Sequence, residues 1–153
     1  MNLFQEFEER KIDYLNDFNS YTYFEYKKID HLDIAIIIPV YGRTQFNHII
    51  TDAFEKAILK SGLNITLNLV EHSENPEHKD LCRNWIHYTY IPKEDKRFNK
   101  CLCFNVGVIH NPMAKYYLFH DSDILVPENF FELLFENMKG YDAVQAFSGQ
   151  RLF

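Results

Sequence analysis

The sequence predicts an α/β protein in which an open, mostly parallel sheet is flanked by helices. Short apolar segments rich in β-branched residues alternate along the chain with segments whose apolar residues recur at helical spacing. Proline or glycine stands at most boundaries between the two kinds of segment. The chain has 153 residues, 46% of them hydrophobic, which is enough for one domain with a buried core.

Five segments are predicted to form strands. The continuous apolar run at residues 34–38 is typical of a strand buried on both faces, and Pro39 would end it. Residues 63–70 alternate between apolar and polar side chains, which predicts a second strand. The other predicted strands are residues 87–91, 116–119 and 143–147.

The predicted helices lie between these strands. Residues 46–58 place apolar side chains at alternating steps of three and one, the pattern of an amphipathic helix, and Gly62 would end it. Similar spacing predicts helices at residues 97–110 and 127–138, and a short helix is expected at residues 79–85. Residues 1–18 are predicted to form an amphipathic helix that packs on the main body.

These elements divide the chain into two parts. Residues 1–30 would form the N-terminal helix and a connector, and residues 31–153 the α/β domain. Because the chain stops soon after the last predicted strand, we expect the domain to be truncated there. A sheet edge left open in this way invites pairing with another chain, so self-association is a further expectation.

Composition excludes several classes of protein. The 16 basic and 22 acidic residues give a net charge of −6, which is unfavourable for binding nucleic acid. The sequence shows no secretory signal and no transmembrane segment, which needs roughly 20 apolar residues. The three cysteines lack the spacing of a zinc site, and we expect buried, reduced thiols and a cytoplasmic location.

Polar residues follow three of the predicted strands, at the point where each strand ends. In an open parallel sheet the carboxyl ends of the strands meet at one edge, and ligands bind there. These clusters therefore predict a binding site at one edge of the sheet. They are residues 39–43, 71–73 and 120–123.

The cluster after the fourth predicted strand contains two aspartates, Asp121 and Asp123. In an extended segment, side chains two residues apart point the same way, so the carboxylates would repel each other unless a cation compensates. Mg²⁺ or Mn²⁺ suits such oxygen ligands and can bridge to phosphate. A solvated turn or a helix cap is the alternative for this pair.

Several other residues have a functional and a structural interpretation. Arg43 and Lys100 could neutralise a diphosphate or could be solvated cations. Phe98 could stack on a base or lie in the core, and Glu71 could accept from a base or ribose or lie in a solvated loop.

Asn105 and Gly107 lie in the predicted helix at residues 97–110. A glycine within a helix costs roughly 1 kcal/mol relative to alanine. Close packing of the helix on a strand would explain it, and so would a ligand that approaches the helix near Asn105.

Three segments carry a resemblance to a known family. They read Ile-Pro-Val-Tyr-Gly-Arg (38–43), Phe-Asn-Lys-Cys-Leu-Cys-Phe-Asn-Val-Gly (98–107) and Phe-His-Asp-Ser-Asp-Ile-Leu-Val-Pro (119–127). In order and spacing they resemble the GT-A glycosyltransferases, a Rossmann-like fold, and most closely the β-1,4-galactosyltransferase family. Family 2 and chondroitin-polymerase-type domains are also similar. The resemblance covers about residues 33–147.

The resemblance implies a metal-dependent enzyme that transfers a sugar from a UDP-sugar to an acceptor hydroxyl, with inversion. The acceptor would be a saccharide or a glycoconjugate. It also implies roles for matching residues: Pro39, Val40, Tyr41 and Arg43 would line the nucleotide site, Phe98 would contact uracil, Lys100 would lie near the diphosphate, Asp121 near the ribose or metal, and Asp123 would ligate Mn²⁺ or Mg²⁺. Tyr41 and Gly42 depart from the family, which often has arginine and asparagine there.

The catalytic residues are not identified in this sequence. In the family, the acceptor site and the catalytic base follow the part that this chain resembles, so the base is expected beyond Phe153. The alternative function is a catalytically incomplete module that binds a nucleotide or a partner. A metal-dependent nucleotidyltransferase is a weaker alternative, because a glycine-rich phosphate loop with a lysine is missing.

Overall fold

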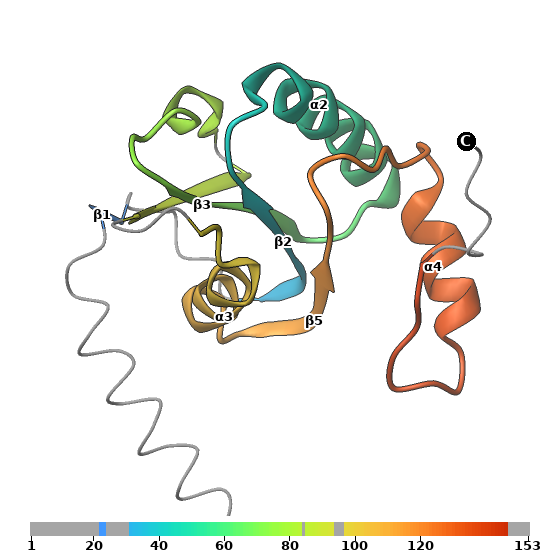
Figure 1. Cartoon of the computed structure of the whole chain (residues 1–153). Coiled ribbons are helices and arrows are strands. Elements are labelled where there is room, and N and C mark those ends of the chain that lie inside the picture. Colours follow the sequence, from blue (N-terminus) through green and yellow to red (C-terminus); the bar gives the residue numbers. More distant parts are fainter. Residues whose placement is uncertain (1–21, 24–30, 84, 94–96, 147–153) are drawn as a thin grey trace, which may run out of the picture.

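The computed structural model describes residues 22–23, 31–83, 85–93 and 97–146 (Figure 1). The helix predicted at residues 1–18 and most of the connector lie outside these residues. The described part is an α/β structure with a parallel sheet flanked by helices, as the sequence predicts.

The parallel sheet contains four strands in the order β4-β3-β2-β5. They are β2 (Leu32–Val40), β3 (Ile65–Ser73), β4 (Ile86–Pro92) and β5 (Ala114–Phe119). The short strand β1 (Thr22–Tyr23) pairs antiparallel with β4 at one edge. In the centre, Ile36 pairs with Leu67 of β3 on one side and with Leu118 of β5 on the other.

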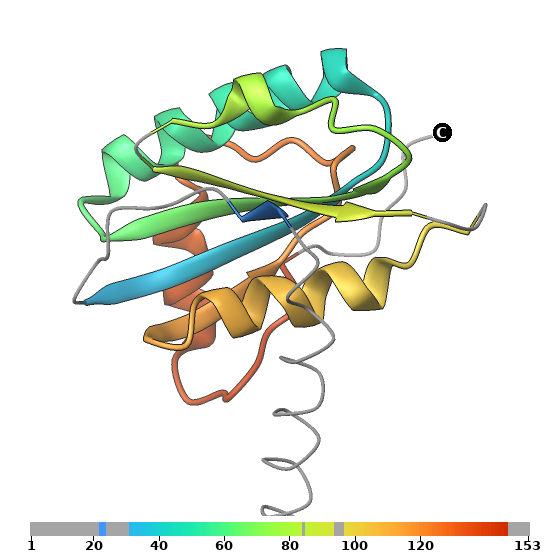
Figure 2. The same cartoon turned by 90° about the vertical axis from the view of Figure 1, so that its left-hand side faces the viewer.

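Helices cover both faces of the sheet. Figure 2 shows α2 (Thr44–Ser61) on one face and α3 (Lys100–His110) on the other. The helix α4 (Phe130–Met138) packs on the same core as α2, and the 3-10 turn η2 (Lys79–Leu81) precedes β4. In the described part of the chain, no helix is both long and apolar enough to span a membrane.

The helix ends follow the local sequence. Gly62 ends α2 with a φ of 66°, a left-handed conformation that favours glycine. Asn99 caps α3, because its side chain accepts a hydrogen bond from the amide of Leu102 at 2.9 Å.

The buried face of α2 differs from the prediction. Phe46 and Ile49, two of the apolar residues expected to face the core, are 59% and 53% exposed. Asn47 and Thr51 are buried instead, together with Ile50, Phe54 and Ala57. Asn47 and Thr51 each donate a hydrogen bond within the protein, which lowers the cost of burying them. The face of α2 that packs on the core is therefore shifted relative to the apolar face that the sequence pattern indicates.

Pro39 does not end β2, contrary to the prediction. The strand continues to Val40, which pairs with Glu71 of β3. The carbonyl of Ile37 faces β5, where it accepts a hydrogen bond from the amide of His120. Backbone groups two residues apart in a strand point to the same side, so the backbone nitrogen of Pro39 also faces β5. Because β5 ends at Phe119, opposite Ile37, the missing N–H of Pro39 leaves no hydrogen bond of the sheet unmade.

The strand β3 is buried along its whole length, because it lies between β2 and β4 and helices cover both faces of the sheet. Two further expectations were wrong. Residues 143–146 of the predicted last strand form no strand, and Phe147 lies outside the described residues. The cysteines are free as expected, but only Cys103 is buried, whereas Cys82 and Cys101 are exposed.

Close packing explains the glycine in α3. A Cβ atom added at Gly107 would lie 2.5 Å from Cγ2 of Ile37, a fully buried residue of β2. Only glycine allows this approach of helix and sheet, so the packing interpretation of Gly107 is confirmed.

We expect Gly107→Ala to lower the free energy of unfolding by about 1–3 kcal/mol, because the added methyl overlaps a β-branched side chain that cannot move away. Urea denaturation measures the change. In an Ile37→Ala background the same substitution should be neutral or stabilising, because the clash is gone and alanine favours the helix. A stabilising effect in the natural sequence would contradict the packing argument.

Candidate functional site

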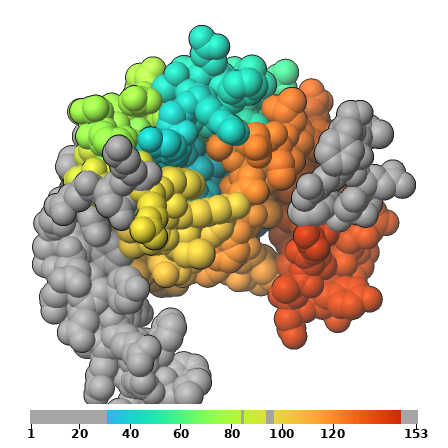
Figure 3. All heavy atoms as spheres, viewed as in Figure 1, coloured from blue at the N-terminus to red at the C-terminus, as the bar shows by residue number. Residues whose placement is uncertain are grey.

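The sheet topology brings three chain segments to one edge. From β2 the chain proceeds through β3 to β4 on one side, and β5 then lies on the other side of β2. The carboxyl ends of β2 and β5 therefore meet at a switch point, the usual ligand-binding position in open α/β sheets. Figure 3 shows the segments after β2 (teal), at the start of α3 (yellow) and after β5 (orange) side by side on one face. We call this edge the carboxyl edge.

The turn between β2 and α2 has an unusual backbone. Gly42 and Arg43 both have positive φ angles, 58° and 57°. Because Arg43 is not a glycine, this left-handed conformation costs about 1–2 kcal/mol and has to be held by other contacts. One of these is a hydrogen bond from the side-chain amide of Asn47 to the carbonyl of Gly42, at 3.2 Å.

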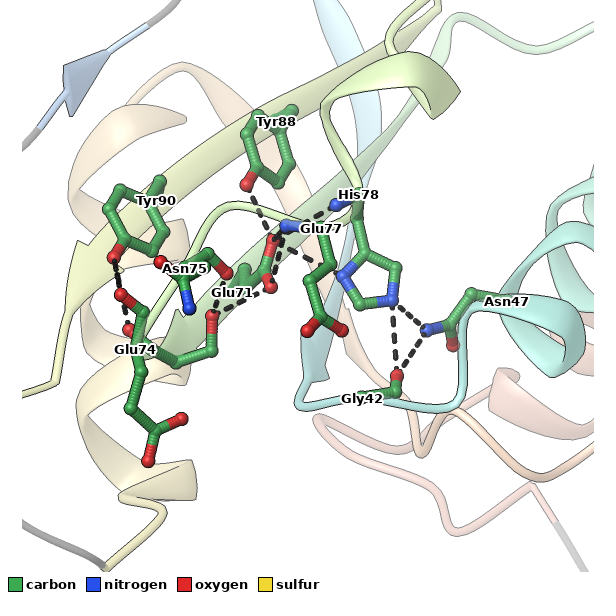
Figure 4. A network of polar contacts seen from close by, with 10 residues as sticks. Gly42, Asn47, Glu71, Glu74, Asn75, Glu77, His78, Tyr88 and Tyr90 are labelled. Carbon is green, nitrogen blue, oxygen red and sulfur yellow. Dashed lines mark hydrogen bonds and ion pairs between the residues drawn. The ribbon is translucent and has the colours of Figure 1, made fainter.

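A buried carboxylate, that of Glu71, lies at the centre of a hydrogen-bond network next to this turn (Figure 4). Both oxygens of Glu71 are fully buried at the end of β3 and accept hydrogen bonds from several donors. These are the hydroxyls of Ser73 and Tyr88, at 2.7 and 2.5 Å, and the amides of Glu77 and His78, at 3.0 and 3.2 Å. Burial alone would raise the pKa of Glu71, but hydrogen bonds from His78, Tyr88 and Ser73 outweigh it and lower the pKa to about 2.

The imidazole of His78 joins this carboxylate to the turn. Its Nδ1 lies 3.2 Å from Oε2 of Glu71, and its Nε2 lies 3.1 Å from the carbonyl oxygen of Gly42 and 2.6 Å from the amide nitrogen of Asn47. The Glu71–His78–Asn47 network therefore fixes the Gly42 carbonyl, and with it the start of α2 and the position of Arg43.

Two ion pairs lie at the carboxyl edge. The guanidinium of Arg43 donates to Oδ2 of Asp123 at 3.3 Å, and the ammonium of Lys100 pairs with Oδ1 of Asp121. All four side chains are about half exposed. The segment after β5 turns at Ser122 rather than staying extended, so each carboxylate faces a base from a different element.

Aromatic rings lie at the same edge. The rings of Tyr41 and Phe98 stack with centroids 5.8 Å apart, and both side chains are partly exposed. Phe98 thus lies at the surface rather than in the core. The ring of His72 lies 6.2 Å from Phe98, and its Nδ1 accepts from the amide of Asn99 at 3.0 Å, which fixes the start of α3.

The structure adds Lys93 to the residues that the sequence suggested. Its side chain is only 1% exposed, and its ammonium lies 3.3 Å from Oε1 of Glu74 and 4.2 Å from the centre of the Tyr41 ring. A nearly buried lysine is rare in proteins. The signal in the sequence is its position directly after the third predicted strand, the same position that marks the other clusters.

Other predicted site residues lie elsewhere. Pro39 and Val40 are buried within β2, and only their backbone reaches the carboxyl edge. Glu71 lies in β3 and is enclosed by its own hydrogen bonds, so it is neither in a solvated loop nor open to a base or ribose, the two expected alternatives. Asn105 is exposed on α3, about one and a half turns beyond Lys100.

The chemistry of the aspartate pair is compatible with a metal only if a ligand completes the coordination. Among the described residues, no group of three or more His, Cys, Asp or Glu side chains could hold a metal ion. Asp121 and Asp123 offer hard oxygen ligands beside two basic side chains, Lys100 and Arg43. Mg²⁺ is commonly bound in this way, through one or two carboxylates together with substrate phosphates.

Fold and site together define an α/β protein in which charged and aromatic side chains gather at the switch point of a parallel sheet. A search against known protein families found no match, and no curated protein matched the sequence significantly.

We expect Glu71→Gln to lower the free energy of unfolding by about 3 kcal/mol, because the amide of glutamine would face donors that need a carboxylate. Thermal or urea denaturation measures this loss. Glu77→Gln is the matched control: its side chain is exposed and its backbone amide still donates to Glu71, so it should be nearly neutral. Equal effects of the two substitutions would contradict the structural role of Glu71.

Proposed function

We propose that this chain binds the donor of a metal-dependent glycosyltransferase of the GT-A type, a UDP-sugar. The main support is that residues from the three resembling segments contact one another at the carboxyl edge. Arg43 of the first segment pairs with Asp123 of the third, and Lys100 of the second pairs with Asp121. Motifs up to 80 positions apart along the chain thus form one cluster.

The chemistry of the cluster suits the parts of such a donor. Uracil would stack at the partly exposed pair of Tyr41 and Phe98. Arg43 and Lys100 would bind the diphosphate, aided by the amino ends of α2 and α3, which begin at this edge. Asp121 and Asp123 would hold Mn²⁺ or Mg²⁺, which supplies charge stabilisation for the leaving diphosphate.

In the proposed reaction, an acceptor hydroxyl of a saccharide or glycoconjugate would attack C1 of the sugar with inversion, as in the β-1,4-galactosyltransferases that the sequence resembles. The bond from C1 to the diphosphate would break, UDP would leave, and the hydroxyl proton would pass to a base that is not assigned among the described residues. We place the protein in the cytoplasm, where its three free thiols would stay reduced. A second candidate is a binding module that transfers nothing and associates through the edge of β5, the last strand of the sheet. Transfer of radiolabelled sugar by the purified chain would exclude the second candidate.

We expect UDP to bind in the presence of Mn²⁺, and Asp123→Ala and Asp121→Ala to weaken this binding at least about tenfold, because each removes a metal ligand. Isothermal titration calorimetry measures the dissociation constants. Asp52→Ala is the matched control, since this exposed carboxylate on α2 pairs with Arg83 at 3.6 Å. UDP binding that does not require a metal, or an equal loss in the control, would contradict the proposal.

A further inference from the structure

Both carboxylates assigned to the metal already have basic partners. Arg43 donates to Asp123 at 3.3 Å, and Lys100 contacts Asp121. The two bases come from different elements, the turn before α2 and the first residue of α3. A metal and these two bases therefore compete for the same carboxylate oxygens.

The charges of the four side chains balance. A divalent cation that bound alone would displace both bases and leave them beside it, so the site would become strongly positive. A diphosphate that bound alone would meet the two carboxylates, so the site would become negative. When both ligands bind, each charge can lie next to an opposite one, which is the electrostatically favourable arrangement.

The side chains can make this exchange without a change of the backbone. Arg43 and Lys100 have long stems, and both are about half exposed. Exposed ion pairs contribute little to stability, so breaking them costs little. The backbone at Arg43 is held separately, through the buried contacts of Gly42 with Asn47 and His78.

We propose that the cluster works by partner exchange: Arg43 and Lys100 move from the aspartates to the diphosphate only when the metal takes their place. This inference rests on the proposed function and adds how the site is controlled. Metal and diphosphate then bind as a coupled pair, and each raises the affinity for the other by the same factor. The ion pairs lower the affinity of the site for a metal that arrives without a nucleotide.

The test is the affinity for Mn²⁺ alone, measured by calorimetry on the full chain. Arg43→Gln and Lys100→Gln should each bind Mn²⁺ at least about threefold more tightly than the natural sequence, because a carboxylate is released from its competitor. The same variants should bind UDP more weakly when Mn²⁺ is present, because the diphosphate loses a base. Opposite signs for the two ligands are the signature of partner exchange.

One variant controls for net charge. Arg83→Gln removes a positive charge whose partners are Asp52 and Glu55, and it should leave the affinity for Mn²⁺ unchanged. If Arg83→Gln tightened Mn²⁺ binding as much as Arg43→Gln, net charge would explain the result and partner exchange would be wrong.

The outcomes separate this inference from the proposed function. If UDP did not bind under any condition, the proposed function would fail, and partner exchange, which needs the diphosphate, would fail with it. If UDP bound with Mn²⁺ but the two glutamine variants bound Mn²⁺ no more tightly, or not at all, partner exchange would be overturned and the proposed function would stand.

Discussion

The carboxylate of Glu71 is the interaction on which the carboxyl edge depends. It is fully buried at the end of β3, it keeps its charge through hydrogen bonds, and it contacts the imidazole of His78. Through His78 and Asn47 it reaches the carbonyl of Gly42. The left-handed backbone at Gly42 and Arg43 costs conformational free energy. The buried network offsets this cost and fixes the backbone position of Arg43.

The protein thus uses the carboxylates at or near the carboxyl edge in two different ways. Glu71 is enclosed by donors that cannot leave, and its contacts determine structure. Asp121 and Asp123 are about half exposed and have flexible partners, Lys100 and Arg43, which solvent and ligands can replace. The first arrangement suits a fixed scaffold, and the second suits a site whose charges rearrange when a ligand binds.

Much of the fold could be predicted from the sequence, because strand and helix patterns are local. The sequence also located Arg43 and the aspartates after strand ends, where parallel topology gathers them, and Phe98 and Lys100 at the start of a predicted helix. Features that depend on contacts between distant parts of the chain could not be predicted, because sequence patterns describe only local structure. The burial of Glu71 depends on Tyr88, 17 positions away, and the tolerance of Pro39 depends on where β5 ends. The rotation of α2 likewise depends on partners that bury Asn47.

We propose that the carboxyl edge between β2 and β5 binds a nucleoside diphosphate together with a metal. An NMR titration of the isotope-labelled chain with UDP and diamagnetic Mg²⁺ tests this binding residue by residue. Amide shifts should change mainly at residues 41–43, 98–100 and 121–123, and either ligand alone should produce much smaller changes. Shifts confined to α4 or to the edge of β5, or no shifts with both ligands present, would contradict it.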